Sequence, residues 1–162
     1  MSQNDHVRPL RPPTDGATVV VLVGMDGSST SWDALSWACG EVRRLRGRAV
    51  AVFVSSSVVN RFGALAFIGA LPLDYGWSDP SATERADSLR REVERYAAGQ
   101  DVGLTFVHTQ GDAAAELLRL AAVLRADQIV VGRSMRARHY LAGSLGRRLI
   151  GKRKAPVVIV VP

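Results

Sequence analysis

Five short, mostly apolar segments constrain the fold of this chain more than any other feature of its sequence. They are four to six residues long, rich in valine and isoleucine, and cover 19–23, 49–54, 104–108, 128–131 and 157–161. Strands that are apolar at successive positions are buried on both faces, which is typical of a parallel sheet covered by helices. The first segment is expected to stop at Gly24.

Segments with helical periodicity separate these strands. Residues 31–45 and 81–98 place apolar side chains three and four positions apart, as do Leu117, Leu120 and Leu124 in a helix that follows Asp112. Residues 144 to about 152 form an expected last helix. Thr30 and Asp33 have the spacing of a capping box, Gly47 is a stop signal, and Asp112 is an expected N-cap. The alternation predicts one α/β domain with an open, doubly wound parallel sheet, right-handed crossovers and helices on both faces.

Two segments fall outside this alternation. Residues 1–16 contain three prolines and almost no apolar periodicity, and we interpret them as a disordered tail before a domain that spans 17–162. Residues 55–80 form an irregular insert. Its apolar side chains favour packing against the domain or against a protein partner.

Composition excludes several classes of protein. The most apolar stretch outside the strands, 64–73, is about half the length that spans a bilayer. Without a spanning segment we expect no membrane partner. No apolar stretch follows the charged start of the chain, so we expect no secretory signal and a cytoplasmic location. Cys39 is the single cysteine and lies on an apolar helix face, which favours an inert, packed thiol.

The net charge of +6 arises in one part of the sequence. Residues 133–154 contain eight Lys or Arg and no acidic residue, whereas the rest of the chain has thirteen basic and fifteen acidic residues. This region suits a phosphate or an anionic surface, or it is a solvated helix face with a basic turn. Nucleic acid is a disfavoured partner because Tyr140 is the only aromatic residue there.

Glycine-rich turns follow the first and fourth strands, at 24–28 and from Gly132. Ligands of doubly wound sheets bind at the carboxyl ends of the strands, where the strand order reverses. Asp26 could accept hydrogen bonds from an adenine amine or ribose hydroxyls, or it could close an Asx turn. Gly143 and Ser144 precede the last helix, where they suit either a phosphate or an ordinary serine cap.

No catalytic constellation emerges from the sequence. His6, His108 and His139 are scattered and lack a paired nucleophile, and the acidic residues form no metal-ligand cluster. Residues 146–152 match the first seven places of a P-loop, but Arg153 stands where a hydroxyl is required and the segment lies in a predicted helix. We therefore reject that motif and expect at most a slow ATPase.

Four segments resemble, in the same order, parts of the universal stress protein family: 20–28, 126–132, 141–146 and 155–161. The resemblance covers roughly 18–161. It implies a five-stranded parallel sheet in the order 3-2-1-4-5, and homodimers that often form through the last strand. It also implies that ATP or another adenine nucleotide is bound, with Mg²⁺.

The family's nucleotide pattern is Gly, two residues, Gly, nine residues, Gly, then Ser or Thr. By this resemblance, Gly132 matches the first glycine, and Gly143 and Ser144 match the final pair. Asp26 and the backbone of Val54 match positions that line the adenosine pocket. The remaining expected site residues are Gly24, Val131, Arg133, Met135 and Leu145. The chain departs from the pattern because Met135 replaces the second glycine and only seven residues follow it before Gly143.

Two functions fit these features. The first is a stress-response protein that binds an adenine nucleotide at the carboxyl ends of strands 1 and 4 and signals through a homodimer. In it, arginines crowd the phosphate position and offset the lost loop contacts: Arg133, Arg136, Arg138, Arg147 and Arg148. The alternative is a family member that binds no nucleotide and acts as a dimeric interaction module through its 55–80 insert.

Overall fold

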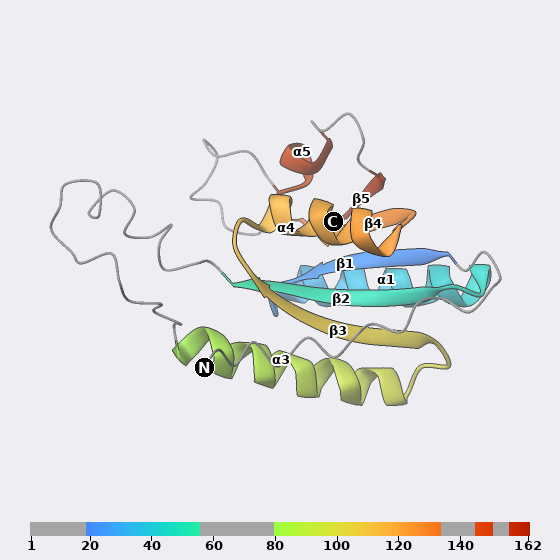
Figure 1. Ribbon diagram of the computed structural model, residues 1–162. Coiled ribbons are helices and arrows are strands. Elements are labelled where there is room, and N and C mark those ends of the chain that lie inside the picture. The colour runs from blue at the N-terminus through green and yellow to red at the C-terminus, as the bar shows by residue number, and fades with distance from the viewer. Residues whose placement is uncertain (1–18, 56–79, 134–144, 151–155) are drawn as a thin grey trace, which may run out of the picture.

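Five parallel strands form one sheet between two layers of helices in the computed structural model, which describes residues 19–55, 80–133, 145–150 and 156–162 (Figure 1). The predicted strand order, β3-β2-β1-β4-β5, is confirmed. The strands are β1 (Val20–Met25), β2 (Arg48–Ser55), β3 (Gly103–Gln110), β4 (Gln128–Gly132) and β5 (Val157–Val161). The helices are α1 (Ser29–Leu45), α3 (Pro80–Ala98), α4 (Ala113–Leu124) and α5 (Leu145–Ile150).

β1 does not stop at Gly24, as the sequence suggested, but continues to Met25. Gly24 pairs with Val52 of β2 and Val131 of β4, so its backbone is held in the ladder on both sides. β2 and β3 also extend beyond their apolar segments at both ends. Strand length therefore follows backbone pairing with neighbouring strands, which apolar character alone does not reveal.

The start of α1 differs from the predicted capping box. The helix begins at Ser29, and the cap is Ser28, whose Oγ accepts a hydrogen bond from the N–H of Ser31 at 3.2 Å. At the other end, Arg46 takes the left-handed conformation. Gly47 instead permits close packing, because a Cβ there would lie 2.3 Å from the carbonyl oxygen of Val19.

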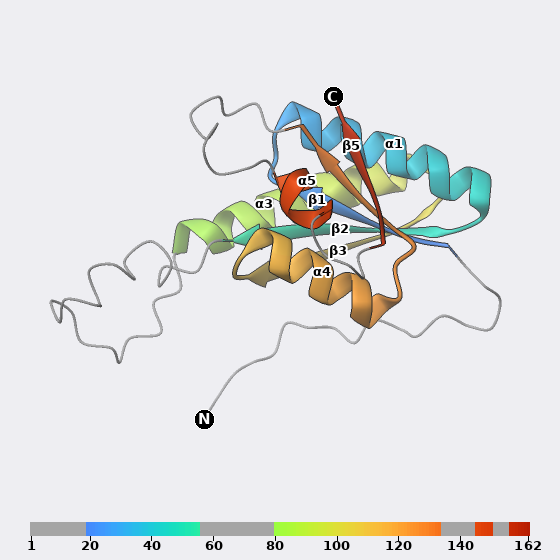
Figure 2. The same ribbon diagram turned by 90° about the horizontal axis from the view of Figure 1, so that it is seen from above.

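Each face of the sheet has its own apolar core, which explains why the strand segments are continuously apolar. Val21 and Val23 point to the face covered by α1 and α3, whereas Val20 and Leu22 point to the face covered by α4 and α5. Figure 2 shows the two helical layers from above. Cys39 is buried in the first core, as predicted, and burial raises the pKa of its thiol.

Several expectations concern segments outside the described residues. These are the 1–16 tail, nearly all of the 55–80 insert, and the flanks of the last helix at 144, 151 and 152. They stay predictions. In the part of the chain that the structure describes, no helix combines the length and apolar character needed to cross a bilayer.

Candidate functional site

The strand order reverses between β1 and β4, so the carboxyl ends of these two strands define the candidate site. The chain passes from β1 to β2 and β3 with α1 and α3 on one face, then crosses to β4 and β5 with α4 and α5 on the other. β1 and β4 pair directly, and Gly24 lies level with Val131. The two strand ends that carry the glycine-rich turns are therefore neighbours, as predicted.

Gly24 and Val131 shape the interior beneath the site. A Cβ at Gly24 would lie 3.1 Å from Cγ1 of Val131 and 3.3 Å from Cδ1 of Leu117 in α4. Val131 is itself buried in the core under α4 and α5. In the described structure these two residues pack β1 against β4 and α4.

Gly132 permits a close contact between the end of β4 and the first turn of α1. A Cβ at Gly132 would lie 2.4 Å from both the carbonyl carbon and oxygen of Thr30. The buried Thr30 also donates a hydrogen bond from Oγ1 to the carbonyl oxygen of Arg133 at 2.9 Å. Its Oγ1 lies 3.2 Å from Oγ of Ser28. The sequence predicted Thr30 as part of a capping box, whereas in the structure it joins the two turns.

Asp26 follows β1 on the surface and closes an Asx turn. Its Oδ1 accepts a hydrogen bond from the N–H of Ser28 at 2.9 Å, and Gly27 between them has a left-handed φ of 83°. This arrangement confirms one of the two interpretations of Asp26. A carboxylate has two oxygens and about four acceptor positions, so the turn is compatible with a further hydrogen bond to a ligand.

The other predicted site residues lie around this point or outside the described ranges. Val54 is half-buried near the end of β2 and pairs with Thr109 of β3. Arg133 is exposed, and its N–H donates to the carbonyl oxygen of Val161 at 2.7 Å. Leu145 begins α5 and packs on the core under α4. Met135, Gly143 and Ser144 are not among the described residues.

Arg148 contacts an acidic side chain of α4. Its Nη2 donates to Oδ1 and Oδ2 of Asp112 at 2.8 Å each. Asp112 is also the N-cap of α4, as predicted, and accepts from the N–H of Ala115 at 3.0 Å. The Ala115 hydrogen bond and, after it, the Arg148 guanidinium hold the pKa of Asp112 below its usual range. Arg148, which we expected near a phosphate, forms in the described structure an ion pair that joins α4 to α5.

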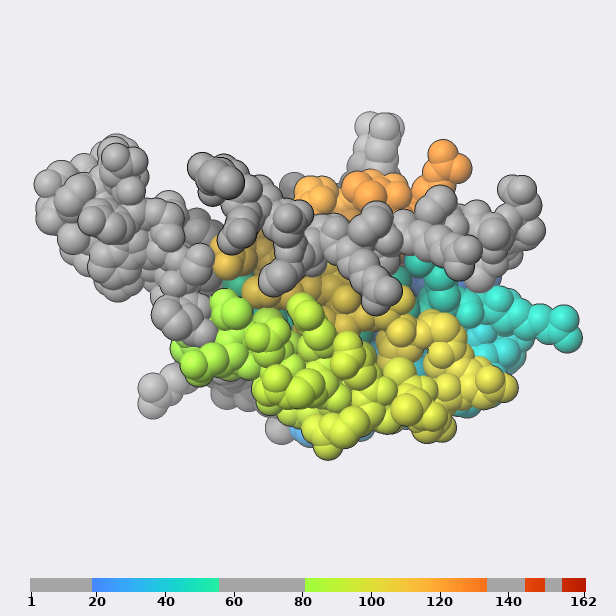
Figure 3. Space-filling model, turned by 60° about the horizontal axis from the view of Figure 1, so that its bottom comes forward, coloured from blue at the N-terminus to red at the C-terminus, as the bar shows by residue number. Residues whose placement is uncertain are grey.

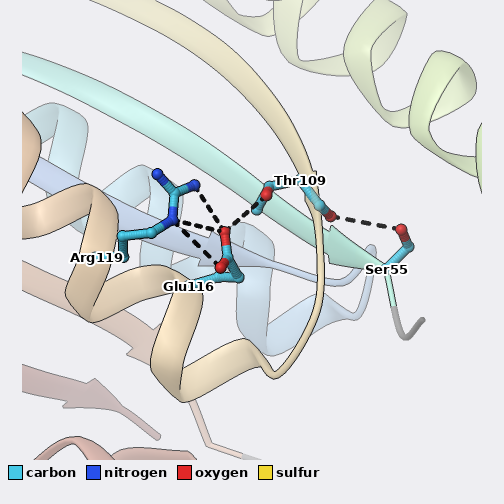
Figure 4. A network of polar contacts seen from close by, with 4 residues as sticks. All are labelled: Ser55, Thr109, Glu116 and Arg119. Atoms are coloured by element: carbon cyan, nitrogen blue, oxygen red, sulfur yellow. Dashed lines mark hydrogen bonds and ion pairs between the residues drawn. The ribbon is translucent and has the colours of Figure 1, made fainter. Parts of the chain in front are cut away.

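A polar network lies at the carboxyl ends of β2 and β3, beside the candidate site (Figure 4). Thr109 donates from Oγ1 to Oε2 of Glu116 at 2.8 Å, and Arg119 donates to the same carboxylate at 2.7 Å. Ser55 donates to the carbonyl oxygen of Thr109 at 3.4 Å. Arg119, and to a smaller extent Thr109, lower the pKa of Glu116. The network spans three elements, so no sequence periodicity identifies it.

His108 has a structural environment. Its Nε2 lies 2.9 Å from Oγ of the buried Ser55, and its ring stacks on Phe53 with centroids 5.5 Å apart. Which of the two atoms donates depends on the tautomer of the ring, and the hydrogen bond together with the stacking on Phe53 packs the ring against β2. Burial and then Arg90 lower the pKa of His108, while Asp87 opposes them.

Metal-binding chemistry finds no support in the described ranges, where no three His, Cys, Asp or Glu side chains gather into a possible metal site. Residues 146–150 are helical, which agrees with the rejection of the P-loop match for that part. The fold therefore defines a doubly wound α/β protein, and the order of its strands reverses between β1 and β4.

The profile described as "Universal stress protein family" matches residues 20–161. The chain therefore belongs to the universal stress protein family. A comparison with curated proteins gives no match.

Solved structures of similar fold include proteins from distant organisms. A universal stress family protein from Burkholderia pseudomallei is 22% identical, with a TM-score of 0.64, over 91% of this chain and 99% of that one. The Archaeoglobus fulgidus protein in complex with dAMP is 17% identical, with a TM-score of 0.63, over 90% and 98%. An Arabidopsis thaliana family protein with AMP bound is 14% identical, with a TM-score of 0.57, over 89% and 92%. At these identities the likeness concerns the fold.

Proposed function

We propose that this protein binds an adenine nucleotide at the carboxyl ends of β1 and β4. The observation that carries the proposal is the direct pairing of these strands at the reversal point, which brings Asp26 and Gly132 to one edge of the sheet. The similar folds that hold dAMP and AMP support the choice of ligand. Asp26 and the backbone of Val54 would contact the adenosine.

The phosphates would follow the loop from Gly132 to Gly143 and Ser144. ATP with Mg²⁺ and AMP are the candidate ligands, and the shortened loop with Met135 leaves the length of the bound phosphate chain as the main question. Hydrolysis of ATP would be slow, because the carboxylates described at the strand ends already accept hydrogen bonds in a turn, a helix cap and an ion pair: Asp26, Asp112 and Glu116.

We also propose a homodimer formed through β5, in a protein that acts in the cytoplasm. β5 is an edge strand, so its outer backbone groups have no partner strand within the described sheet. Val157 and Val160 on this strand are 63% and 46% exposed, and Ile150 of α5 is 66% exposed. Pairing of two copies along β5 would cover these side chains.

Titration calorimetry with ATP and Mg²⁺, and with AMP, tests the nucleotide site. We expect Asp26→Ala and Gly143→Val to lose binding while the melting temperature without ligand stays the same. Asp101→Ala removes an exposed carboxylate between α3 and β3, at the amino ends of the strands, and is the matched control. Unchanged affinity of both site variants for the nucleotides would refute the proposed site.

The alternative function is a dimeric interaction module without nucleotide. One contact favours it: Arg148 pairs with Asp112 in the described structure rather than with a phosphate. Absence of heat with both nucleotides, together with a melting temperature that neither nucleotide raises, would support this alternative. Sedimentation equilibrium of Val157→Lys, with Val123→Lys as an exposed control on α4, tests the β5 dimer in either case.

A further inference from the structure

The amino ends of the strands, opposite to the candidate site, carry a surface that we call the amino-end rim. It consists of residues 43–48, 99–103 and 123–128, where α1, α3 and α4 end and the next strands begin. These segments contain five arginines and two aspartates, a net charge of +3. In Figure 1 the rim forms the right-hand end of the sheet, and in Figure 3 the end of α1 and the α1–β2 turn, in cyan, reach the right-hand edge.

Backbone contacts fix the rim on both sides of the start of β1. The N–H of Arg48 donates to the carbonyl oxygen of Val19 at 2.8 Å, and the N–H of Asp127 donates to that of Val20 at 2.9 Å. α1 and α4 cover opposite faces of the sheet. Arg46 and Arg125, which follow these helices, therefore flank the same point from the two faces.

Arg46 and Arg125 also adopt an unusual backbone conformation. Their φ angles are 52° and 51°, and no other non-glycine residue in the described ranges has a positive φ. Glycine is the usual residue at this position after a helix, because a side chain raises the conformational energy there. Basic residues in the last turn of a helix stabilise the helix by interacting with its dipole. That effect does not require an arginine at the residue with left-handed backbone conformation.

Three of the five arginines lack an acceptor within the described structure. Arg44 pairs with Glu41 at 2.6 Å and Arg43 donates to Gln100 at 2.7 Å. Arg46 and Arg125 are exposed and have no ion pair or side-chain hydrogen bond to a described residue. Arg48 is half-buried, and its Nε is buried with no hydrogen-bond acceptor. The exposed guanidinium groups of Arg46 and Arg125 are available to phosphate oxygens, which arginine binds in bidentate geometry.

Exposed aliphatic side chains are close to these arginines in the sequence. Leu45, between Arg44 and Arg46, is 38% exposed, and Val123, two residues before Arg125, is 67% exposed. Nucleic acid would contact the arginines but gain little from the aliphatic groups, and 43–48, 99–103 and 123–128 contain no aromatic residue for stacking on bases. A bilayer surface uses both, because phosphates pair with arginine while aliphatic groups enter the headgroup region.

We propose that the amino-end rim docks on membranes that carry anionic phospholipids. The proposal is independent of the nucleotide site, which lies at the other end of the sheet. It concerns contact with the bilayer surface, whereas the expectation of no membrane partner rested on the lack of a spanning segment.

Vesicle co-sedimentation of the full chain tests this proposal. We expect binding to vesicles of phosphatidylcholine mixed with phosphatidylglycerol and none to phosphatidylcholine alone. The double variant Arg46→Glu/Arg125→Glu should weaken partitioning about tenfold or more, since each arginine near an anionic surface contributes a substantial share of the attraction. Arg85→Glu/Arg91→Glu, on exposed positions of α3, makes the same change in net charge elsewhere and should retain most of the binding.

A second double variant separates the aliphatic contribution to vesicle binding from the electrostatic contribution. Leu45→Ser/Val123→Ser should weaken partitioning while the dependence on salt stays the same, and circular dichroism checks that each variant folds. The proposal is overturned by no binding to the mixed vesicles, by equal losses in the rim and α3 double variants, or by duplex DNA that competes fully with the vesicles at equal phosphate concentration. The last result would identify nucleic acid as the partner of the rim.

Discussion

Replacement of Gly132 by alanine is expected to destabilise the protein substantially. The added Cβ would lie 2.4 Å from the carbonyl carbon and oxygen of Thr30 and 2.8 Å from the nitrogen of Ser31. All three are backbone atoms of the first turn of α1, so no side chain can rotate away. Overpacking of a well-packed interior costs about 1–3 kcal/mol, and the rigid neighbours place this substitution near about 3 kcal/mol.

Urea unfolding followed by circular dichroism measures this change. For a chain of this length, a loss of about 3 kcal/mol corresponds to a melting temperature lower by roughly 6–12 °C. Gly40→Ala is the matched control, because Gly40 lies in α1 with no heavy atom within 4 Å of the added Cβ. Alanine should stabilise the helix there by about 0.5–1 kcal/mol. An unfolding free energy for Gly132→Ala equal to that of the unmodified protein would refute the close-packing argument.

Substitutions at four other positions test further contacts. Because the folded-state pKa of His108 is lowered, the unfolded chain binds more protons below about pH 6.5, so stability should fall as the pH decreases through that value. His108→Gln should reduce this slope in urea titrations at several pH values. Asp112→Ala should cost about 1 kcal/mol through the lost cap of α4. Arg148→Ala should cost less than about 1 kcal/mol, since the side chains of this pair are 51% and 40% exposed. Thr30→Val should cost about 1 kcal/mol by removing the hydrogen bond to Arg133, and Thr30→Ser should retain it; equal melting temperatures would contradict this.

The sequence predicted the helices better than the strand ends and caps. α3 differs from its predicted range by one residue, and Leu117 and Leu120 of α4 are buried on the predicted face. The predicted end of β1 and the predicted start of α1 were each wrong by two residues. The end of β1 depends on the pairing of Gly24 with neighbouring strands, and the start of α1 depends on Ser28, rather than Thr30, being the cap. Hydrophobic periodicity reports which side chains are buried, whereas element ends depend on backbone hydrogen bonds.

The candidate site shows the same division between sequence and tertiary structure. The glycine-rich turns after two apolar strands indicated where a ligand would bind, because parallel strands end at one edge of their sheet. That Gly132 packs against the backbone of Thr30, and that Arg148 pairs with Asp112 thirty-six positions away in the sequence, could not be read from local patterns. Such contacts join residues that become neighbours only after the sheet has formed.

Charge shows most clearly what the sequence determines and what the tertiary structure decides. The sequence alone fixes the continuous apolar strands, the helical stripes and thus the α/β class, because burial on both faces requires those patterns. It places the excess positive charge in 133–154 and gives the rest of the chain a slight negative charge. Only the fold brings the ends of α1, α3 and α4 together into a rim of net charge +3, since helices that follow parallel strands all end at the same edge of the sheet.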